Sequence, residues 1–554
     1  MTVKIIRVTC FAFALAFFGF LVGAEDAIAR PPFNRGVNLT GWFDVASPGQ
    51  IQFQRFTKKN FTEIKSLGAD VIRLPINLHA MTNGAPDYTL DPLFLGFLDQ
   101  VVDWAEELGL YIILDNHTFD PARPTDATID RALLKVWPQM ARHFQGRSDR
   151  VLYEVLNEPH GIDLGRWAKI QGKVIDAIRA VDARHTIVIG SANSNNYRDL
   201  EKLPKYADKN LIYTFHFYDP FMFTHQGADW TTPSLVDLSG VPYPPAERPI
   251  PPTPESLMGT WADDALRIYR VDGSLQRIKE LIDIAADFSA KRGVPVFCGE
   301  FGVYITRAKN NDRVAWYRDV RTYLEEKGIP WTSWDYMGGF GLFTTINGRR
   351  FESDLNVPVV KALGFTPPAQ KSGARKAERA ALDIYRDYAG DGIITGGYLQ
   401  KGYIDFYSKD NPASGQYALR WGGCERYGAI SFYFAEPRDF SVLLSEGYAI
   451  ELMARAAGTS TKFEVRFRNP YEEVNAKPWR MSYTVEVSEI PADNTWHRVR
   501  IPLSDMRETG AWKNAWFQPE GKFSWKEIAC FEIVAEHLPL SKCEYTFDDI
   551  RIVK

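Results

Sequence analysis

The feature that most constrains this chain is an alternation of short apolar, β-rich runs with longer amphipathic stretches between about residues 34 and 337. Segments such as LDQVVDWAEELG (98–109) and QRIKELIDIAADFSAKRG (276–293) have the spacing of amphipathic helices. The β-rich runs are RGVNLT (35–40), ADVIRLPI (69–76), LYIILDNH (110–117), VLYEVLNEP (151–159), HTIVIGSA (185–192), LIYTFHFY (211–218), VPVFCGEFG (294–302) and WTSWDYM (331–337). Strands that alternate with helices form parallel sheets, and eight such units over roughly 300 residues fit a closed (β/α)₈ (TIM) barrel better than an open sheet.

Polar or ionisable residues occur at the C-terminal ends of most of these runs. In a (β/α)₈ barrel those ends converge on one face, where active sites are built. The side chains predicted to meet there are Arg73, His117, Asn157, Glu158, His216, Tyr218, Glu300 and Trp334. Each alone is more often a structural residue, but core packing does not explain a polar terminus on most strands.

Two glutamates each follow an apolar run, Glu158 in LNEP (156–159) and Glu300 in CGEFG (298–302). A carboxyl group in such a place is costly unless it is paired or functional. Hydrolysis of a glycosidic bond needs a proton for the leaving oxygen and stabilisation of an oxocarbenium-like transition state. Two carboxyl groups whose environments separate their pKa values can divide this work. The pair therefore predicts a glycoside hydrolase, with two structural ion pairs at the barrel rim as the alternative.

The motifs around these glutamates resemble glycoside hydrolase family 5, the cellulase family, over about residues 30–365. The matching positions are GVN (36–38), Arg73 in VIRLP (71–75), His117 in LDNH (114–117), Asn157 and Glu158 in NEP (157–159), HFY (216–218), Glu300 in GEFG (299–302) and Trp334. The resemblance implies a retaining mechanism with Glu158 as general acid/base and Glu300 as nucleophile, without a metal or a cofactor.

The same resemblance implies roles for the neighbouring side chains. Arg73 and Tyr218 are expected to hold Glu300 ionised, and Asn157 to bind the 2-hydroxyl of the sugar. His117 and His216 are expected to bind hydroxyl groups or to orient Glu158, and Trp334 to give the sugar beside the scissile bond a flat platform.

The stretch from Asp219 to about Ala262 interrupts the alternation of strands and helices. It contains PYPPAERPIPPTP (242–254), which cannot form a regular helix or a central strand. Such a loop forms either a wall or lid of the substrate cleft or a passive insertion. Trp42, Trp230 and Phe340 also follow barrel strands and are further candidates for lining the cleft.

The chain beyond residue 365 has a different pattern. Residues 366–380 (TPPAQKSGARKAERA) read as a linker, and residues 381–554 contain short alternating runs separated by turn signals, which predict an all-β sandwich. The runs WHRVRIPL (496–503) and FDDI (547–550) resemble galactose-binding-like jelly rolls of family 11 carbohydrate-binding modules and their relatives. The resemblance implies sugar binding, with a purely structural domain as the alternative. The candidate sugar platforms are Trp479, Trp512, Trp516 and Trp525, and the candidate Ca²⁺ ligands are Asp548 and Asp549.

Residues 1–29 have the order of a secretory signal peptide: Lys4 and Arg7, an apolar run (8–24), and AIA at 27–29. We expect cleavage near Ala29 and a secreted or periplasmic protein without membrane contact; an uncleaved anchor is the alternative. Export permits disulfides. The mature chain would contain Cys298, Cys424, Cys530 and Cys543, of which the last two are nearest in sequence, and four buried free thiols are the alternative.

Composition adds two limits. The net charge of −4 gives no electrostatic reason to expect nucleic acid as a partner. Aromatic residues make up 14% of the chain, which fits either a large core or sugar binding.

The predicted function is that of a monomeric, exported, retaining endo-β-1,4-glucanase acting on cellulose-like or mixed-linkage β-glucan. Because fold does not fix substrate, a β-1,3-glucanase, a β-mannanase and a non-catalytic polysaccharide-binding protein remain alternatives.

Overall fold

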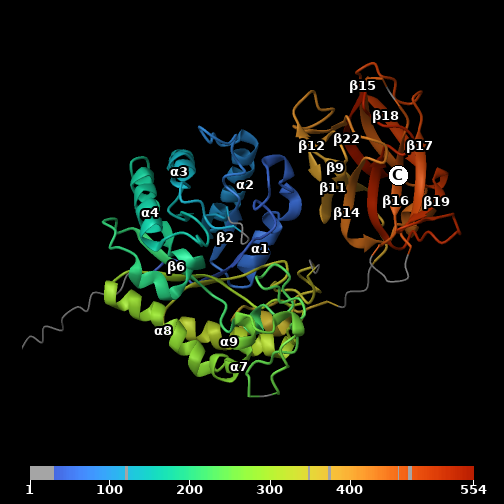
Figure 1. The fold of residues 1–554 in the computed structure, drawn as a ribbon. Helices are drawn as coiled ribbons and strands as arrows, with labels where there is room; N and C mark the ends of the chain where they lie inside the picture. The colour runs from blue at the N-terminus through green and yellow to red at the C-terminus, as the bar shows by residue number, and fades with distance from the viewer. Residues whose placement is uncertain are drawn as a thin grey trace, which may run out of the picture.

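The computed structural model describes residues 30–118, 123–246, 248–346, 350–371, 376–459, 461–471 and 477–554. A closed barrel of parallel strands occupies the N-terminal part, and two antiparallel sheets form the C-terminal part beside it (Figure 1). The predicted signal peptide, residues 1–29, lies outside the described residues.

All eight predicted runs form barrel strands, in sequence order. They are β1 (Arg35–Asn38), β2 (Val71–Ile76), β3 (Tyr111–Asn116), β4 (Val151–Glu154), β5 (Ile187–Gly190), β6 (Leu211–Phe217), β7 (Val296–Phe301) and β8 (Trp331–Ser333). Strand β1 pairs in parallel with both β2 and β8, which closes the barrel. The predicted (β/α)₈ architecture is therefore confirmed.

Helices surround the barrel (Figure 1). They are α1 (Lys58–Ser66), α2 (Pro92–Leu108), α3 (Asp130–Phe144), α4 (Leu164–Arg179), α5 (Ala192–Asn195), α6 (Phe221–Thr224), α7 (Trp261–Asp272), α8 (Leu275–Arg292), α9 (Asn310–Glu326) and α10 (Val357–Ala362). Short 3₁₀ turns are η1 (Pro48–Gln50), η2 (Phe53–Arg55), η3 (Tyr197–Lys202) and η4 (Glu255–Leu257). Local sequence sets the helix ends: α2 begins where the Asp91 side chain accepts the Leu93 and Phe94 N–H groups, and it ends at Gly109 in the left-handed conformation (φ 66°).

The C-terminal part is built of antiparallel strands, as predicted, around a core of its own. One sheet contains β9 (Leu382–Arg386), β10 (Tyr388–Ala389), β12 (Tyr403–Ser408), β13 (Ala418–Gly422), β15 (Ala449–Gly458), β18 (His497–Pro502) and β22 (Cys543–Val553). The other contains β11 (Ile393–Tyr398), β14 (Ala429–Arg438), β16 (Phe463–Arg468), β17 (Trp479–Val485), β19 (Arg507–Trp512), β20 (Trp516–Phe517) and β21 (Ile528–Val534). Helix α11 (Ser441–Ser445) and the turn η5 (Leu503–Asp505) complete this part. The jelly-roll resemblance itself stays a prediction.

The barrel and the sandwich share an aromatic contact. Phe53 and Phe97 of the barrel meet Tyr388 and Tyr407 of the sandwich, with ring centroids 5.3 Å (Phe53–Tyr388) and 5.0 Å (Phe97–Tyr407) apart. The Tyr407 hydroxyl also donates to the carbonyl of Ile51. The contact joins the segment after β1 to the sandwich.

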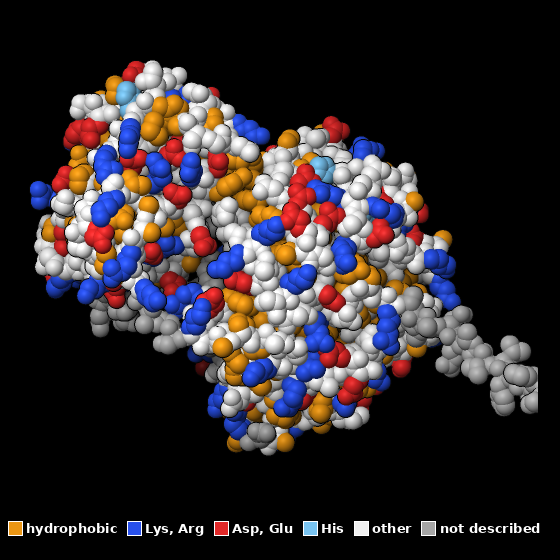
Figure 2. Space-filling view, turned by 180° about the vertical axis from the view of Figure 1, so that it is seen from behind, with side chains coloured by type: hydrophobic (Ala, Val, Ile, Leu, Met, Phe, Trp, Pro, Cys, Tyr) orange, Lys and Arg blue, Asp and Glu red, His pale blue; other side chains and the backbone are white. Residues whose placement is uncertain are grey.

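The four cysteines of the described chain are free and buried, including Cys530 and Cys543. The candidate disulfide between these two is therefore absent from the structure. Figure 2 shows acidic and basic side chains interspersed over one face of the molecule, as expected for a net charge of −4. In the described ranges, no helix combines the length and the hydrophobicity that crossing a bilayer requires.

Candidate active site

Arg73 on β2 is the centre of the polar groups inside the barrel. Its Nε and Nη2 donate to the two oxygens of Glu154, both at 2.8 Å, and its Nη1 donates to Glu300 Oε1 at 2.8 Å. Burial alone would lower the pKa of Arg73, but the charges of Asp115 and Glu154 outweigh it and hold the pKa well above its ordinary value. The guanidinium is therefore a fixed positive charge beside Glu300.

The structure corrects the predicted position of two side chains along their strands. Arg73 is the third residue of β2 and not its last, so it lies deeper in the barrel than the rim. Strand β4 ends at Glu154, and Glu158 lies in the loop that follows. Both side chains nevertheless reach the same site as Glu300.

Glu300 lies within β7 and is buried, with an exposed fraction of 4%. Besides Arg73, the Tyr218 hydroxyl binds it, donating to Oε2 at 2.8 Å. Burial, followed by the charge of Glu300, raises the pKa of Tyr218 well above its ordinary value, so the phenol keeps its proton. Glu300 therefore has one hydrogen-bond donor on each of its two oxygens.

A β-bulge aligns Glu300 with His216. In the register of β6 and β7, Phe215 pairs with Cys298 but His216 pairs with Glu300, so Gly299 is the extra residue. A Cβ atom at Gly299 would lie 2.7 Å from Thr214 Oγ1 and 3.2 Å from His216 Nε2. Only glycine fits this position without displacing a neighbour.

Glu158 is held by the backbone of the β4–α4 loop. The Asn157 N–H donates to the carbonyl of Asn116 (2.9 Å) and the Ser194 N–H to that of Pro159 (3.1 Å). Glu158 itself has a positive φ of 41°, a conformation that a non-glycine residue adopts only under constraint from its surroundings. The backbone hydrogen bonds of the loop thus hold Glu158 in a strained conformation, which fixes the direction of its carboxyl group.

The environment of Glu158 favours its protonated form. Burial raises its pKa from 4.5 to about 7, against smaller opposing effects of His117 and Arg73. Glu158 Oε1 lies 2.6 Å from Nδ1 of His216. Burial lowers the pKa of His216 to about 4, so this imidazole is neutral near pH 7 and can accept the carboxyl proton in a hydrogen bond.

His117, Trp334 and Asn157 form the side of the site next to β3 and β8. His117 Nδ1 lies 2.7 Å from Asp115 Oδ2, and its ring stacks on Trp334 with a centroid separation of 5.4 Å. Burial opposes protonation of His117, but Asp115 outweighs it and raises the pKa of this histidine. Asn157 Oδ1 accepts from Arg73 at 2.8 Å, which directs the amide toward the site. All eight side chains predicted from the sequence therefore lie together.

The two glutamates lie close to each other across the site. One carboxylate oxygen of Glu158, one oxygen of Glu300 and one ring nitrogen of His216 lie within 4.8 Å of one another. Three such atoms could hold a metal ion by distance alone. However, both oxygens of Glu300 already accept from Arg73 and Tyr218, and His216 Nδ1 already contacts Glu158. A cation bound here would also meet the positive charge of Arg73.

Aromatic side chains extend the site toward the long insertion. Phe340 contacts Tyr218 (6.1 Å between centroids), and Trp230 contacts Tyr304 (4.8 Å) as well as Phe340 (6.3 Å). Trp230 is 44% exposed, so it offers a ring face to solvent from the start of the insertion. Trp42, the third candidate, is fully buried in the core and does not line the cleft.

Sequence reasoning missed three residues that complete the network. Asp115 and Glu154 hold Arg73, and Asn195 lies 3.4 Å from His216 Nε2. The sequence could have indicated Asp115 and Glu154, because an ionisable residue inside an apolar strand is buried and a buried charge needs a partner. Asn195 ends the short segment α5, whose last three residues have positive φ, and nothing in its surroundings in the sequence indicates its position.

The family model of cellulase (glycosyl hydrolase family 5) matches residues 34–339, more than half of the chain. The chain belongs to glycosyl hydrolase family 5. It is therefore a glycoside hydrolase, and the match covers all eight barrel strands and the eight site residues predicted from the sequence.

Several relatives of this family 5 chain are endoglucanases. Endoglucanase 3 of Fibrobacter succinogenes is 30% identical over 356 residues, which are 60% of this chain and 52% of that protein. Endoglucanase C of Acetivibrio thermocellus is 28% identical over 329 residues, 55% of this chain and 91% of that protein. Among solved structures, a hyperthermophilic endo-β-1,4-glucanase in complex with substrate is 28% identical with a TM-score of 0.50, covering 60% of this chain and 97% of that one. The match with this chain spans about half the length of Endoglucanase 3. Each of the three matches covers at most 60% of this chain.

Proposed function

We propose that this chain is an exported endo-β-1,4-glucanase that hydrolyses cellulose-like or mixed-linkage β-glucan with retention of anomeric configuration. The observation that carries the proposal is the pair Glu158 and Glu300. One oxygen of each lies within 4.8 Å of the other, and Glu300 contacts the Arg73 guanidinium whereas Glu158 contacts His216. Retaining enzymes place their carboxyl groups about 5–5.5 Å apart, whereas inverting enzymes need about 6.5–9.5 Å to admit a water molecule. The spacing supports double displacement.

In the first step, a carboxylate oxygen of Glu300 attacks the anomeric carbon while the bond to the leaving oxygen breaks. Glu158 gives its proton to that oxygen, and the departing sugar leaves a glycosyl ester on Glu300. In the second step, Glu158 takes a proton from water, and the oxygen of that water replaces Glu300 at the anomeric carbon. Both steps fit a Glu158 that is protonated at rest and a Glu300 whose two oxygens accept hydrogen bonds from Arg73 and Tyr218.

The proposal about substrate derives from the endoglucanase relatives and from the exposed ring of Trp230 near the site. A panel of carboxymethyl cellulose, mixed-linkage glucan, β-1,3-glucan and β-mannan tests it. We expect fast loss of viscosity with cellulose-like and mixed-linkage substrates and slower turnover of the other two. Preference for β-mannan or β-1,3-glucan would replace the proposed substrate. NMR of the first products tests the mechanism, and inverted anomers would refute double displacement.

Variants of the two glutamates test their roles. We expect Glu300→Ala to abolish turnover, and azide to restore turnover to Glu158→Ala on glycosides with good leaving groups, because such substrates need no proton in the first step. Wild-type activity of Glu300→Ala would remove Glu300 from the mechanism.

For the sandwich, we propose carbohydrate binding. Its four candidate tryptophans separate into two groups: Trp479 and Trp525 are buried or partly buried, whereas Trp512 and Trp516 are 53% and 43% exposed and pair across β19 and β20. Reduced retention of Trp512→Ala/Trp516→Ala on insoluble cellulose would support this role, and unchanged retention would refute it. The candidate Ca²⁺ ligands already have protein partners, Ser414 for Asp548 and Arg386 for Asp549. Export is proposed from residues 1–29 alone.

A further inference from the structure

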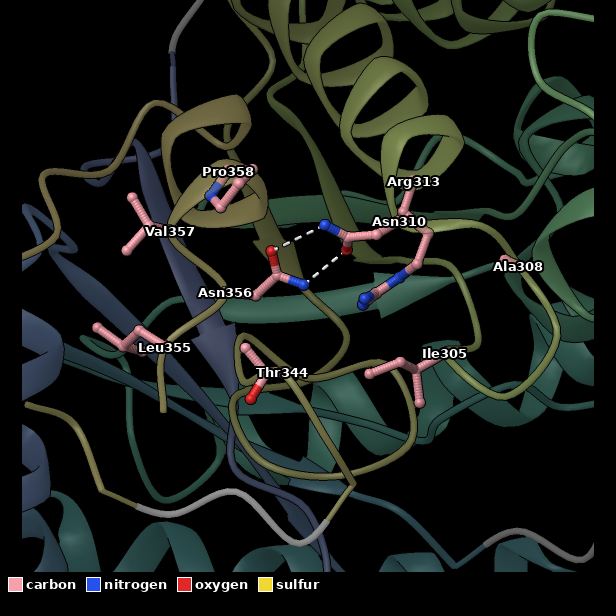
Figure 3. A pocket seen from close by; sticks show the side chains of 9 residues that line it. All are labelled: Ile305, Ala308, Asn310, Arg313, Thr344, Leu355, Asn356, Val357 and Pro358. Carbon is pink, nitrogen blue, oxygen red and sulfur yellow. Dashed lines mark hydrogen bonds between the residues drawn. The ribbon is translucent and has the colours of Figure 1, made fainter. Parts of the chain in front are cut away.

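A second pocket, separate from the two glutamates, lies between the loops that follow β7 and β8 (Figure 3). Its volume is about 460 Å³. Apolar side chains such as Ile305 and Leu355 line one part of it, and Asn310 and Asn356 line another. These two amides are locked together by reciprocal hydrogen bonds of 2.7 and 3.3 Å, drawn in Figure 3, so they form a fixed polar edge.

The unusual member of the lining is Arg313 from the first turns of α9. Figure 3 shows its guanidinium pointing into the pocket, toward the pair of asparagines. The side chain is 1% exposed, and its guanidinium carbon lies 5.9 Å from the centroid of the Tyr317 ring. Among the described residues, Nε has no hydrogen-bond partner, and Nη2 donates to the carbonyl of Gly341 at 3.3 Å. Within the described ranges, no carboxylate lies at ion-pair distance from Arg313. Burying a guanidinium without an ion pair costs free energy, because its charge has lost the surrounding water.

Neighbouring groups compensate this charge only in part, because burial lowers the pKa of Arg313 despite the opposing effects of Tyr317 and Asp335. Asp312, the acidic residue adjacent to Arg313, already binds Arg248 and the N–H of Tyr243. Helix α9 has 17 residues, and Lys309 at its N-cap makes no side-chain capping bond. The positive end of the helix dipole therefore adds to the charge of Arg313 at the same edge of the pocket.

We propose that this pocket binds a carboxylate anion of about the size of a sugar acid, with the carboxylate on the Arg313 guanidinium. A planar guanidinium matches a carboxylate through two parallel hydrogen bonds. The asparagine pair and Thr344 would take hydroxyl groups, and the apolar lining would contact the carbon face of the ring. A neutral sugar would leave the charge of Arg313 only partly compensated and would bind more weakly.

Calorimetric titration of the full chain tests the proposal, with D-glucuronate as the probe and D-glucose as the neutral counterpart. We expect saturable binding of one glucuronate per chain and at least about tenfold weaker binding of glucose. Arg313→Gln should remove the preference for glucuronate. Arg318→Gln on the same helix is the matched control, because Arg318 is 58% exposed and lies outside the pocket lining; it should bind like the wild type.

A second variant covers the case in which Arg313→Gln does not fold. Ala308→Phe fills the pocket and leaves the guanidinium in place, and it should also abolish glucuronate binding while circular dichroism stays unchanged. Equal affinity for glucose and glucuronate would overturn the proposal. Binding that survives in both pocket variants, or that is lost equally in Arg318→Gln, would overturn it as well.

Discussion

At the scale of single residues, two carboxyl groups within 4.8 Å of each other are made chemically different by distinct means. Glu158 is governed mainly by burial, which raises its pKa to about 7. Glu300 is more deeply buried, with a side-chain exposure of 5% against 16% for Glu158, and accepts hydrogen bonds from Arg73 and Tyr218. In the proposed mechanism, the carboxyl group that contacts the Arg73 guanidinium is the nucleophile, and the other is the acid.

The first prediction concerns pH. Because Glu158 must carry a proton to start the reaction, kcat/KM should fall about tenfold per pH unit above an apparent pKa near 7. The same shift affects stability: the folded state binds this proton more tightly than the unfolded state, so stability should fall between about pH 4.5 and 7 as the pH rises. Glu158→Gln should lose the alkaline limb of its residual activity and flatten this part of the stability profile. An unchanged alkaline limb in Glu158→Gln would assign it to another group.

The second prediction concerns the donor to the nucleophile. Tyr218→Phe removes a hydrogen bond to Glu300, which should cost about 1.5–3 kcal/mol in the transition state, or roughly 10- to 100-fold in kcat. Tyr153→Phe is the control, since its hydroxyl binds Asp182, which has no place in the site. It should lower the melting temperature and leave kcat near wild type. Equal effects of both variants on kcat would show that the Tyr218 hydroxyl has no specific role.

At the scale of elements, one bulge between β6 and β7 brings His216 and Glu300 into register. The apolar runs predicted both strands but could not show the bulge, because strands buried on both faces have no alternating pattern for an extra residue to interrupt. The sequence also does not show where a strand ends: Arg73 is predicted at the end of a strand, but it is the third residue of β2. The composition of the site was readable from the sequence, whereas the depth of each side chain depends on strand length and stagger.

The third prediction tests the bulge. Gly299→Ala places a Cβ atom 2.7 Å from Thr214 Oγ1 and 3.2 Å from His216 Nε2, so it should displace His216 and lower kcat at least about tenfold. Gly96→Ala in α2 makes the same chemical change in open space. It should raise stability by about 0.5–1 kcal/mol, because alanine is the better helix former, and leave kcat unchanged. Wild-type kcat in Gly299→Ala would show that the bulge has no role in alignment.

At the scale of the whole molecule, the (β/α)₈ barrel and the β-rich C-terminal part followed from the change in hydrophobic period alone. The contact between them did not. Phe53 and Phe97 have the same surroundings in the sequence as core residues, so nothing distinguishes an aromatic side chain that faces the sandwich from one that faces the barrel. Without Tyr388 and Tyr407, the rings of Phe53 and Phe97 would lose these packing contacts with the sandwich.

The fourth prediction concerns this contact. Tyr407→Ala removes a ring packed on Phe97 and a hydroxyl bound to the Ile51 carbonyl, and it should destabilise the chain by about 3 kcal/mol. We also expect calorimetry to show two separate unfolding transitions where the wild type shows one. Tyr398→Ala is the control, because Tyr398 is 55% exposed in the same domain, and it should change stability by less than about 0.5 kcal/mol. A single unshifted transition in Tyr407→Ala would mean that the domains are not coupled through this residue.

The most direct measurement traps the covalent intermediate. A 2-fluoro β-cellobioside with a good leaving group should form a stable ester with the nucleophile, and mass spectrometry of the digested protein then identifies the labelled side chain. We expect one 2-fluorocellobiosyl group per chain, attached to Glu300, and no label in Glu300→Ala. A label on Glu158 or on any other residue would contradict the assignment of Glu300 as the nucleophile.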